Sequence, residues 1–350
     1  MKFELSEDQA LLRQSTRDFL TSEWPLEKAR KVIEHNPRGY ETAEWARLAE
    51  MGYLGLTLPP SVGGQGLGAV ELAVVLEEVG RACMPGPYLD VVLAAAALAA
   101  AGGQDGLLRK ISAGQALVTL ARDDAAFAGS NGNATRVETG RLRGTKYFVP
   151  FAEPADALVV TAADGVYLAQ APFAVTPLAT LDAAQRFGAV TFDHAATRLG
   201  ALNLLERVDL LAAVGAAATL LGIMSRCLEM TMEYVQTRQA FKRPIGSFQA
   251  LQHRLADMLL KTESTRSAVY RAAWCFDAQD ADTALACAAA KAYAGDASRM
   301  VCGESIQMHG GIGFTWELDL HFYFKRAKTL EQHYGSTEVQ LERALLAAGF

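Results

Sequence analysis

The chain has 350 residues, a length typical of about two or three domains. Hydrophobic residues make up 51% and charged residues 21%, a balance that excludes a chain disordered throughout. The formal net charge of -6 excludes a global positive field, so neither nucleic acid nor an anionic membrane is an expected partner. An anionic ligand would have to be bound by a local group of basic residues.

The cysteines and the apolar stretches indicate the compartment. The five cysteines are odd in number, widely spaced and form no Cys-x-x-Cys pair, which favours a reducing compartment and predicts no structural metal site. The acidic start lacks the apolar run of a signal peptide. The apolar stretch Leu204–Met224 is interrupted by Glu206, Arg207 and Asp209, so it is no clean membrane span. We therefore expect a soluble, cytoplasmic protein.

The first part of the chain, from Leu5 to about Ala101, has the apolar spacing of α-helices. Ser6 is a predicted N-cap, because two acidic residues follow it in the first turn. Further helices are predicted over Glu41–Met51 and Val70–Arg81. Between them the prolines and glycines of Pro59–Gly68 predict a loop.

The middle part, from about Ala116 to Arg198, consists of short β-prone runs separated by turn-forming residues. No long helical pattern lies between these runs, so they predict an antiparallel sheet or a small barrel. The expected strands are Ala116–Leu120, Tyr147–Val149, Leu158–Thr161, Gly165–Ala169 and Val190–Phe192.

After Leu204 the pattern is helical again almost to Phe350, with breaks at Pro244 and at Gly310–Gly313. Ser247 is the expected N-cap of the helix that follows the first break. The order of elements predicts an α+β chain of three domains. Their expected bounds are 1–115 for an N-terminal helical domain, 116–203 for a central β domain and 204–350 for a C-terminal helical domain.

The first segment with chemical potential is Tyr234–Gly246, at the end of a long helix. Arg238, Lys242 and Arg243 fall within two turns, and Phe241 lies among them. A guanidinium beside an aromatic ring suits a phosphate or pyrophosphate with an adjoining ring. The alternative is a solvated C-terminal turn, where the helix dipole favours cations without any ligand.

The second segment is Gln307–Thr315, in which a predicted helix runs into Gly310 and Gly311. Paired glycines allow another backbone or a ligand to approach closely. The alternative is an ordinary helix C-cap with a left-handed glycine. Each segment is a weak signal by itself.

Taken together, these segments carry a resemblance to a known family. The chain resembles the acyl-CoA dehydrogenases, a family of flavoproteins, and the likeness extends over the whole length. The segments that carry it are Arg238–Ile245 followed by Gln249–Met258, Gln307–Gly313, Glu50–Gly66 and Glu77–Ala82. The resemblance implies the acyl-CoA dehydrogenase fold, with a central antiparallel β domain and a C-terminal four-helix bundle.

The resemblance also implies a tetramer with FAD at a subunit interface. The residues that would contact FAD here are Arg238, Phe241, Gln249, Gln307, Gly310, Gly311 and Ser336. The first four would reach the FAD of the neighbouring subunit. The implied reaction removes a proton from Cα and a hydride from Cβ of an acyl-CoA thioester, which gives a 2-enoyl-CoA. An electron-transfer flavoprotein would then reoxidise the FAD.

The sequence departs from the family at the catalytic base. The usual glutamate position falls at Tyr334, and the alternative position of some members falls at Ala212, so neither holds a carboxylate. A tyrosine with an ordinary pKa near 10 is a poor base at neutral pH. Asp209 and Glu206 are weak candidates for a displaced base, because acids at a helix start are commonly dipole-favoured surface groups.

A second departure lies in the β domain, where relatives hold the flavin ring within the same subunit. The usual Thr-Glu-Pro is replaced by Arg122-Asp123-Asp124, ahead of the turn Ala128–Asn131. The usual Trp-Ile-Thr reads Phe148-Val149-Pro150, and proline removes a backbone donor.

These departures follow a pattern. Residues that would serve a neighbour's FAD are kept, whereas residues for the chain's own flavin and for proton removal are lost. The pattern suggests one subunit of an α2β2 dehydrogenase of fatty acid or sterol degradation, and a homotetramer with a displaced base stays open as the alternative. The sequence is also compatible with a non-catalytic structural paralogue within such an assembly, and with a flavin monooxygenase or oxidase on the same fold.

Overall fold

The computed structural model describes residues 4–124 and 135–350. Contacts group the chain into two compact units that are discontinuous in sequence. The helical unit comprises Met1–Arg30, Ala69–Met84 and Leu210–Phe350, and the sheet unit comprises Lys31–Gly68 and Pro85–Asp209. The predicted order of helices, sheet and helices is confirmed, whereas the three domain bounds stay a prediction.

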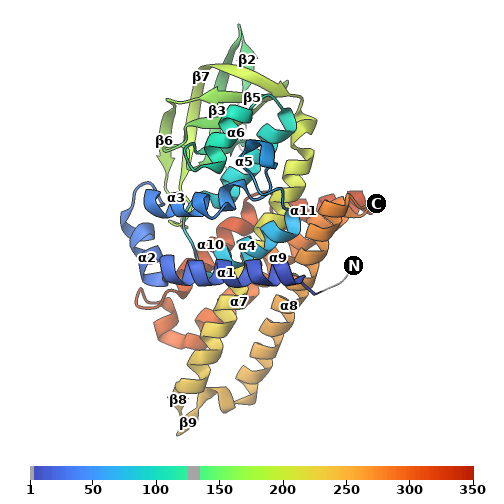
Figure 1. The fold of residues 1–350 in the computed structure, drawn as a ribbon. Coiled ribbons are helices and arrows are strands. Elements are labelled where there is room, and N and C mark those ends of the chain that lie inside the picture. The colour runs from blue at the N-terminus through green and yellow to red at the C-terminus, as the bar shows by residue number, and fades with distance from the viewer. Residues whose placement is uncertain (1–3, 125–134) are drawn as a thin grey trace. The chain divides into compact units, whose positions relative to one another are not determined.

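The helical unit contains the long helices α7 and α8, with α1 running across them (Figure 1). The bounds of the helices in this unit are α1 Glu7–Glu23, α4 Ala69–Arg81, α7 Glu206–Thr237, α8 Gln249–Ala278, α9 Thr283–His309, α10 Leu320–Gln332 and α11 Thr337–Ala347. The first residues of α7 belong to the sheet unit. Ser6 caps α1 as predicted, and its backbone and side chain form a capping box with Gln9.

Two glycines allow α4 and α7 to cross at close range. A Cβ atom at Gly222 would lie 1.8 Å from the carbonyl oxygen of Glu77, and one at Gly80 would lie 2.0 Å from that of Thr219. Such separations are far below van der Waals contact, so only glycine fits at these two positions. Beside the crossing, the buried carboxylate of Glu77 accepts hydrogen bonds from Arg266 and Tyr270.

The sheet unit contains a seven-stranded sheet in the order β1-β4-β5-β7-β3-β2, with β6 paired to β7 (Figure 1). The bounds are β1 Val118–Ala121, β2 Arg136–Glu138, β3 Arg141–Pro150, β4 Ala157–Ala162, β5 Gly165–Gln170, β6 Ala174–Leu178 and β7 Phe187–Gly200. The expected antiparallel sheet is wrong at one pair, because β1 and β4 run parallel. The two strands are separated along the chain by β2 and β3, and so no hairpin turn forces them to reverse direction.

The helices of the sheet unit are α2 Leu26–His35, which begins in the helical unit, α3 Thr42–Glu50, α5 Tyr88–Ala101 and α6 Asp105–Ser112. Neither α2 nor α6 was predicted by its bounds from the sequence. The prediction that Ser247 is an N-cap is wrong, because α8 begins at Gln249 with Phe248 at the N-cap. The hydroxyl of Ser247 instead donates to the carbonyl of Pro244, which closes the short turn before α8.

One helical stretch among the described residues, Leu202–Thr237, is long and apolar enough to cross a membrane. However, 83% of its most apolar window is buried inside the protein. A long apolar helix that is mostly buried is typical of a protein core. The same helix also makes the close crossing with α4 at Gly222.

Candidate functional site

Arg238 lies at the end of α7, where the chain leaves the helix for a tight hairpin. Its backbone is fixed on both sides: its N–H donates to the carbonyl of Tyr234 at 2.8 Å, and its carbonyl accepts from Ile245 at 2.8 Å. Its side chain is exposed and makes no hydrogen bond or ion pair with any residue in 4–124 or 135–350. The guanidinium is therefore uncommitted and available to an external group.

The hairpin that follows is formed by β8 (Gln239–Ala240) and β9 (Arg243–Pro244) and projects beyond the ends of α7 and α8 (Figure 1). Its tip holds Phe241, with φ of 52° and a side chain 90% exposed, and Lys242, with φ of 64°. A left-handed conformation is costly for a side-chain-bearing residue. Arg243 lies 4.2 Å over the ring of Phe248, which supports the base of the hairpin.

The end of α9 presents the second group of predicted contacts. Gln307 is exposed, and the helix ends at Gly310, whose φ is 63°. A Cβ atom at Gly310 or Gly311 would meet nothing within 4 Å, whereas one at Gly313 would lie 2.4 Å from the carbonyl of Ile306. The backbone at the two glycines is thus open to an approaching group, and Gly313 serves the packing of the turn itself.

A pair of stacked rings joins these two helix ends. Tyr234 on α7 lies against His309 on α9, with ring centroids 4.3 Å apart and an interplanar angle of 27°. The Tyr234 hydroxyl donates to the carbonyl of His309 at 3.3 Å, and Nδ1 of His309 bonds to the carbonyl of Ser305 at 2.7 Å. Burial lowers the pKa of His309. Neither ring was predicted from the sequence as part of a site.

Gln249 and Ser336 are the remaining predicted cofactor contacts. Gln249 is the first residue of α8, and its side chain is exposed. Ser336 caps α11, since its side chain accepts a hydrogen bond from the backbone of Val339 at 3.4 Å. Ser336 therefore has a structural role that does not depend on a cofactor.

The turn Tyr334–Gly335 includes the position at which the sequence predicts the family's usual base to fall. Both residues have positive φ, 62° and 93°. Lys291 is fully buried and donates to the carbonyls of Glu331 at 3.1 Å and Gly335 at 3.2 Å. Gln340 donates to the carbonyl of Tyr334 at 2.8 Å. Burial lowers the pKa of Lys291 to about 8.

The carboxylates considered as substitutes for the base are differently placed. Asp209 forms a two-oxygen ion pair with Arg122, so its carboxylate is engaged within the sheet unit. Glu206 is the first residue of α7 and is exposed, and Ala212 is buried. Near the Tyr334 turn, the buried carboxylate of Glu331 accepts from Arg299 at 3.1 Å and Lys328 at 2.7 Å.

In the sheet unit, the residues predicted to stand at the family's flavin cradle bond to neighbouring groups of the same chain. Lys146 is fully buried and bonds to Asp124 at 2.7 Å, to the carbonyl of Arg122 at 2.8 Å and to Thr161 at 3.0 Å. Burial raises the pKa of Asp124, but hydrogen bonds from Lys146 and Thr135 outweigh this effect and hold the pKa below its usual value. These groups have internal partners and do not fit a flavin held at this place.

Phe148 and Pro150, the residues at the predicted Trp-Ile-Thr position, also have contacts within the chain. The carbonyl of Pro150 accepts a hydrogen bond from Thr119 at 2.7 Å, and Phe148, with φ of 49°, packs edge-on against Phe187. The turn predicted over Ala128–Asn131 lies outside the described residues.

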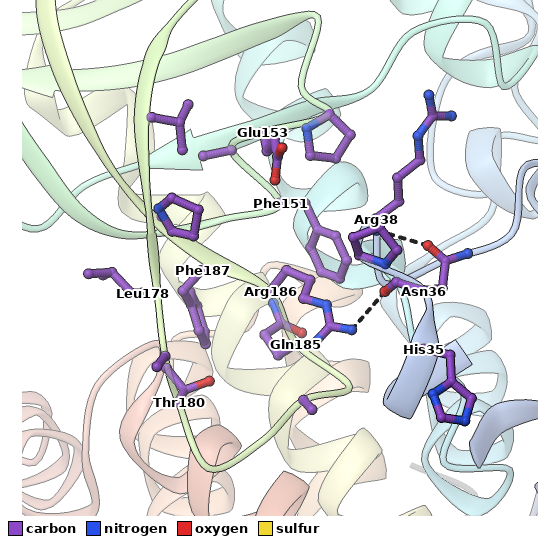
Figure 2. Close-up of a pocket in the computed structure, with 18 of the residues that line it drawn as sticks. His35, Asn36, Arg38, Phe151, Glu153, Leu178, Thr180, Gln185, Arg186 and Phe187 are labelled. Carbon is purple, nitrogen blue, oxygen red and sulfur yellow. Dashed lines mark hydrogen bonds between the residues drawn. The ribbon is translucent and has the colours of Figure 1, made fainter. Parts of the chain in front are cut away.

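A hollow of about 590 Å³ lies within the sheet unit, between the end of α2 and the strand ends near β6 and β7 (Figure 2). Arg186 donates to the carbonyls of Ile33 at 3.1 Å and Asn36 at 2.7 Å, which ties the C-terminal end of α2 to the loop before β7. Phe151 and Phe187 contribute aromatic walls. The residues predicted from the sequence as contacts or base do not line this hollow.

The architecture is that of the acyl-CoA dehydrogenase fold: helices, then a β-sheet, then a C-terminal group of long antiparallel helices. Comparison of the sequence with family models leads to the same result. The acyl-CoA dehydrogenase N-terminal domain matches residues 6–126, and the C-terminal domain matches residues 211–348. The chain belongs to the acyl-CoA dehydrogenase family.

Relatives over the full length support this assignment. Acyl-CoA dehydrogenase IpdE2 of Mycolicibacterium smegmatis is 34% identical over 97% of this chain and 98% of its own length. Among solved structures, the ChsE4-ChsE5 complex from Mycobacterium tuberculosis contains a chain that is 31% identical, with a TM-score of 0.90 and 99% of both chains covered. A chain of the Tcur3481-Tcur3483 steroid ACAD is 28% identical, with a TM-score of 0.89 and 98% of both chains covered.

Proposed function

We propose that this chain is the base-lacking subunit of a heteromeric, FAD-dependent acyl-CoA dehydrogenase. The observation that carries the proposal is an asymmetry in the structure. Arg238, Gln307 and Gly310 are exposed at neighbouring helix ends, whereas Arg122 and Asp124 are engaged in internal ion pairs. The chain is thus suited to hold the FAD of another subunit and poorly suited to hold its own.

The relatives support the heteromer and the class of substrate. One structurally similar protein is solved as the ChsE4-ChsE5 complex, and another carries the paired name Tcur3481-Tcur3483 and is described as a steroid ACAD. We therefore favour an α2β2 assembly that acts on a bulky acyl-CoA, such as a fatty or sterol side-chain thioester, in the cytoplasm. An electron-transfer flavoprotein is the expected electron acceptor.

The proposed reaction is α,β-dehydrogenation of the thioester to a 2-enoyl-CoA. FAD, when bound, supplies the acceptor for the hydride that leaves Cβ. This chain's contribution is to hold the nucleotide: Arg238 binds the pyrophosphate, Gln249 and Gln307 donate from their carboxamides, and Gly310–Gly311 admits the adenine end to the backbone.

The proton at Cα requires a carboxylate that this chain does not place at Tyr334 or Ala212. General-base catalysis typically contributes about 10²–10⁴-fold to the rate, so we assign the base to the homologous partner. The homotetramer with a displaced base is less well supported, because Asp209 is paired with Arg122.

Flavin binding by the co-expressed heteromer tests the proposal. The substitution Arg238→Ala should weaken FAD binding by about 1.5–3 kcal/mol, the usual cost of a lost charge-assisted hydrogen bond. Arg271→Ala is the matched control, because Arg271 is an exposed arginine paired with Asp282 at the other end of α8. Unchanged FAD affinity in the Arg238 variant would refute the assignment.

The same preparation separates the candidate functions. A heteromer that carries flavin and passes electrons from an acyl-CoA to an electron-transfer flavoprotein supports the dehydrogenase. A colourless assembly that stays without flavin after FAD is added indicates the structural paralogue. Rapid reoxidation of the reduced flavin by air indicates a monooxygenase or oxidase.

A further inference from the structure

The stacked rings of Tyr234 and His309 occupy a place between the two groups of predicted nucleotide contacts. We infer that this ring pair is a positioning device that holds Arg238 and the Gly310–Gly311 turn in register for a single dinucleotide. The inference rests on the proposed function, since it concerns how the FAD of a neighbouring subunit is held. Neither ring is itself assigned a contact with FAD.

The chain connections of the two rings support this role. Tyr234 is one helical turn before Arg238, and the N–H of Arg238 donates to the carbonyl of Tyr234 at 2.8 Å. His309 directly precedes Gly310, the first residue of the open turn. A movement of either ring therefore moves the backbone of one predicted contact relative to the other.

Two interactions lock the rings together. The stack itself has a centroid distance of 4.3 Å, and an offset pair of this kind adds to the stabilisation from burial. In addition, the Tyr234 hydroxyl donates at 3.3 Å to the carbonyl of His309, which is one of the last carbonyls of α9 and has no partner within that helix. The bond from His309 Nδ1 to Ser305 fixes the orientation of the imidazole.

A hollow lies beside the ring pair, so few other contacts join the two helix ends at this place. It has a volume of about 330 Å³ and is lined on the α7 side by Thr237 and Met230, and on the other side by Ile312 and Leu318. Side chains of residues 4–124 and 135–350 leave this space open, and the two rings are themselves part of its lining. The contact between the last turn of α7 and the turn after α9 is therefore made mainly by Tyr234 and His309.

The test measures FAD affinity of the flavin-depleted heteromer by fluorescence titration, and its thermal midpoint without FAD. We expect Tyr234→Leu to weaken FAD binding about tenfold, the effect of a lost aromatic pair. Tyr234→Phe keeps the stack and should weaken binding less than threefold. Tyr293→Leu is the matched control. Tyr293 is also a half-buried tyrosine, but it lies on α9 and packs under Lys261.

A double-mutant cycle distinguishes positioning from a general loss of stability. If Tyr234 acts by placing Arg238, then Tyr234→Leu combined with Arg238→Ala should bind FAD nearly as well as Arg238→Ala alone. Fully additive losses would overturn the inference, because they would show that the ring does not act through the arginine. If Tyr234→Leu does not fold, the same cycle is made with His309→Leu.

The outcomes also separate this inference from the proposed function. Wild-type FAD affinity in Tyr234→Leu, together with weakened binding in Arg238→Ala, overturns the ring pair's role and leaves the proposed function standing. Wild-type affinity in both variants overturns both. A lower thermal midpoint with unchanged FAD affinity likewise overturns the positioning role, since it indicates a structural contact only.

Discussion

Replacement of Lys291 by methionine should change how the stability of the protein depends on pH. Lys291 is fully buried and donates to two carbonyls, those of Glu331 and Gly335. Burial lowers its pKa from 10.5 to about 8. The charged form is therefore disfavoured in the folded state relative to the unfolded chain.

The sign and size of the effect follow from this difference. Below about pH 8 the lysine is charged in both states, and the folded protein bears the full cost of the buried charge. As the pH rises from 8 towards 10.5, the unfolded chain holds the proton while the folded protein has lost it, so folding becomes more favourable. The difference between a pKa of 10.5 in the unfolded chain and about 8 in the folded protein corresponds to about 3 kcal/mol of unfolding free energy.

The assay is denaturant unfolding of the wild-type protein and Lys291→Met at several pH values between 7 and 10.5. The difference in unfolding free energy should move by about 3 kcal/mol in favour of the wild type across this range. The unpaired carbonyls left by methionine add a constant that does not vary with pH. Lys110→Met, at an exposed lysine, is the control. A difference that stays flat with pH would refute the reasoning.

Three other substitutions have defined outcomes. Lys242→Gly should raise stability by about 1–2 kcal/mol, because glycine adopts the left-handed tip conformation without strain, and a lower melting temperature would contradict this. Gly222→Ala should destabilise by at least about 1–3 kcal/mol, since its Cβ would lie 1.8 Å from the Glu77 carbonyl, as checked by denaturant midpoint. Tyr334→Phe should leave turnover of the reconstituted heteromer nearly intact, and a collapse in kcat would make the hydroxyl catalytic.

The features that the sequence predicted well are local or periodic. The cap at Ser6 involves Gln9, only three residues away, and helix α4 differs from its predicted bounds by one residue. The five expected strand runs overlap β1, β3, β4, β5 and β7, whereas β2 and β6 were not predicted. Short-range preferences suffice for such elements, because the deciding contacts lie within one or two turns.

The features that were missed depend on contacts between distant residues. Tyr234 and His309 are 75 positions apart, and no periodic pattern in either helix marks them as partners. The parallel pairing of β1 with β4 depends on the path of the chain between them. The buried ion pair of Lys146 with Asp124 is likewise invisible in composition, where a lysine in a strand is expected at the surface.

The predicted cofactor contacts stand between these cases. The motif placed Arg238 and the Gly310–Gly311 turn at helix ends, and the structure shows both exposed there. Their service to FAD stays a prediction, as does the absence of a base in this chain. The structure adds physical detail to that absence, because Asp209, one of the weak substitutes, is paired with Arg122.

The turn that carries Tyr334 is held by hydrogen bonds to its backbone, and the ring of Tyr334 contacts the ring of His333 at a centroid distance of 4.0 Å. Lys291 and Gln340 donate hydrogen bonds to carbonyl oxygens of the turn, and Ser336 is the N-cap of the following helix. A change of side chain at position 334 alters the contact with His333 but leaves these backbone hydrogen bonds in place. Acid-base capacity at position 334 would thus be carried by a side chain that none of these backbone bonds involves.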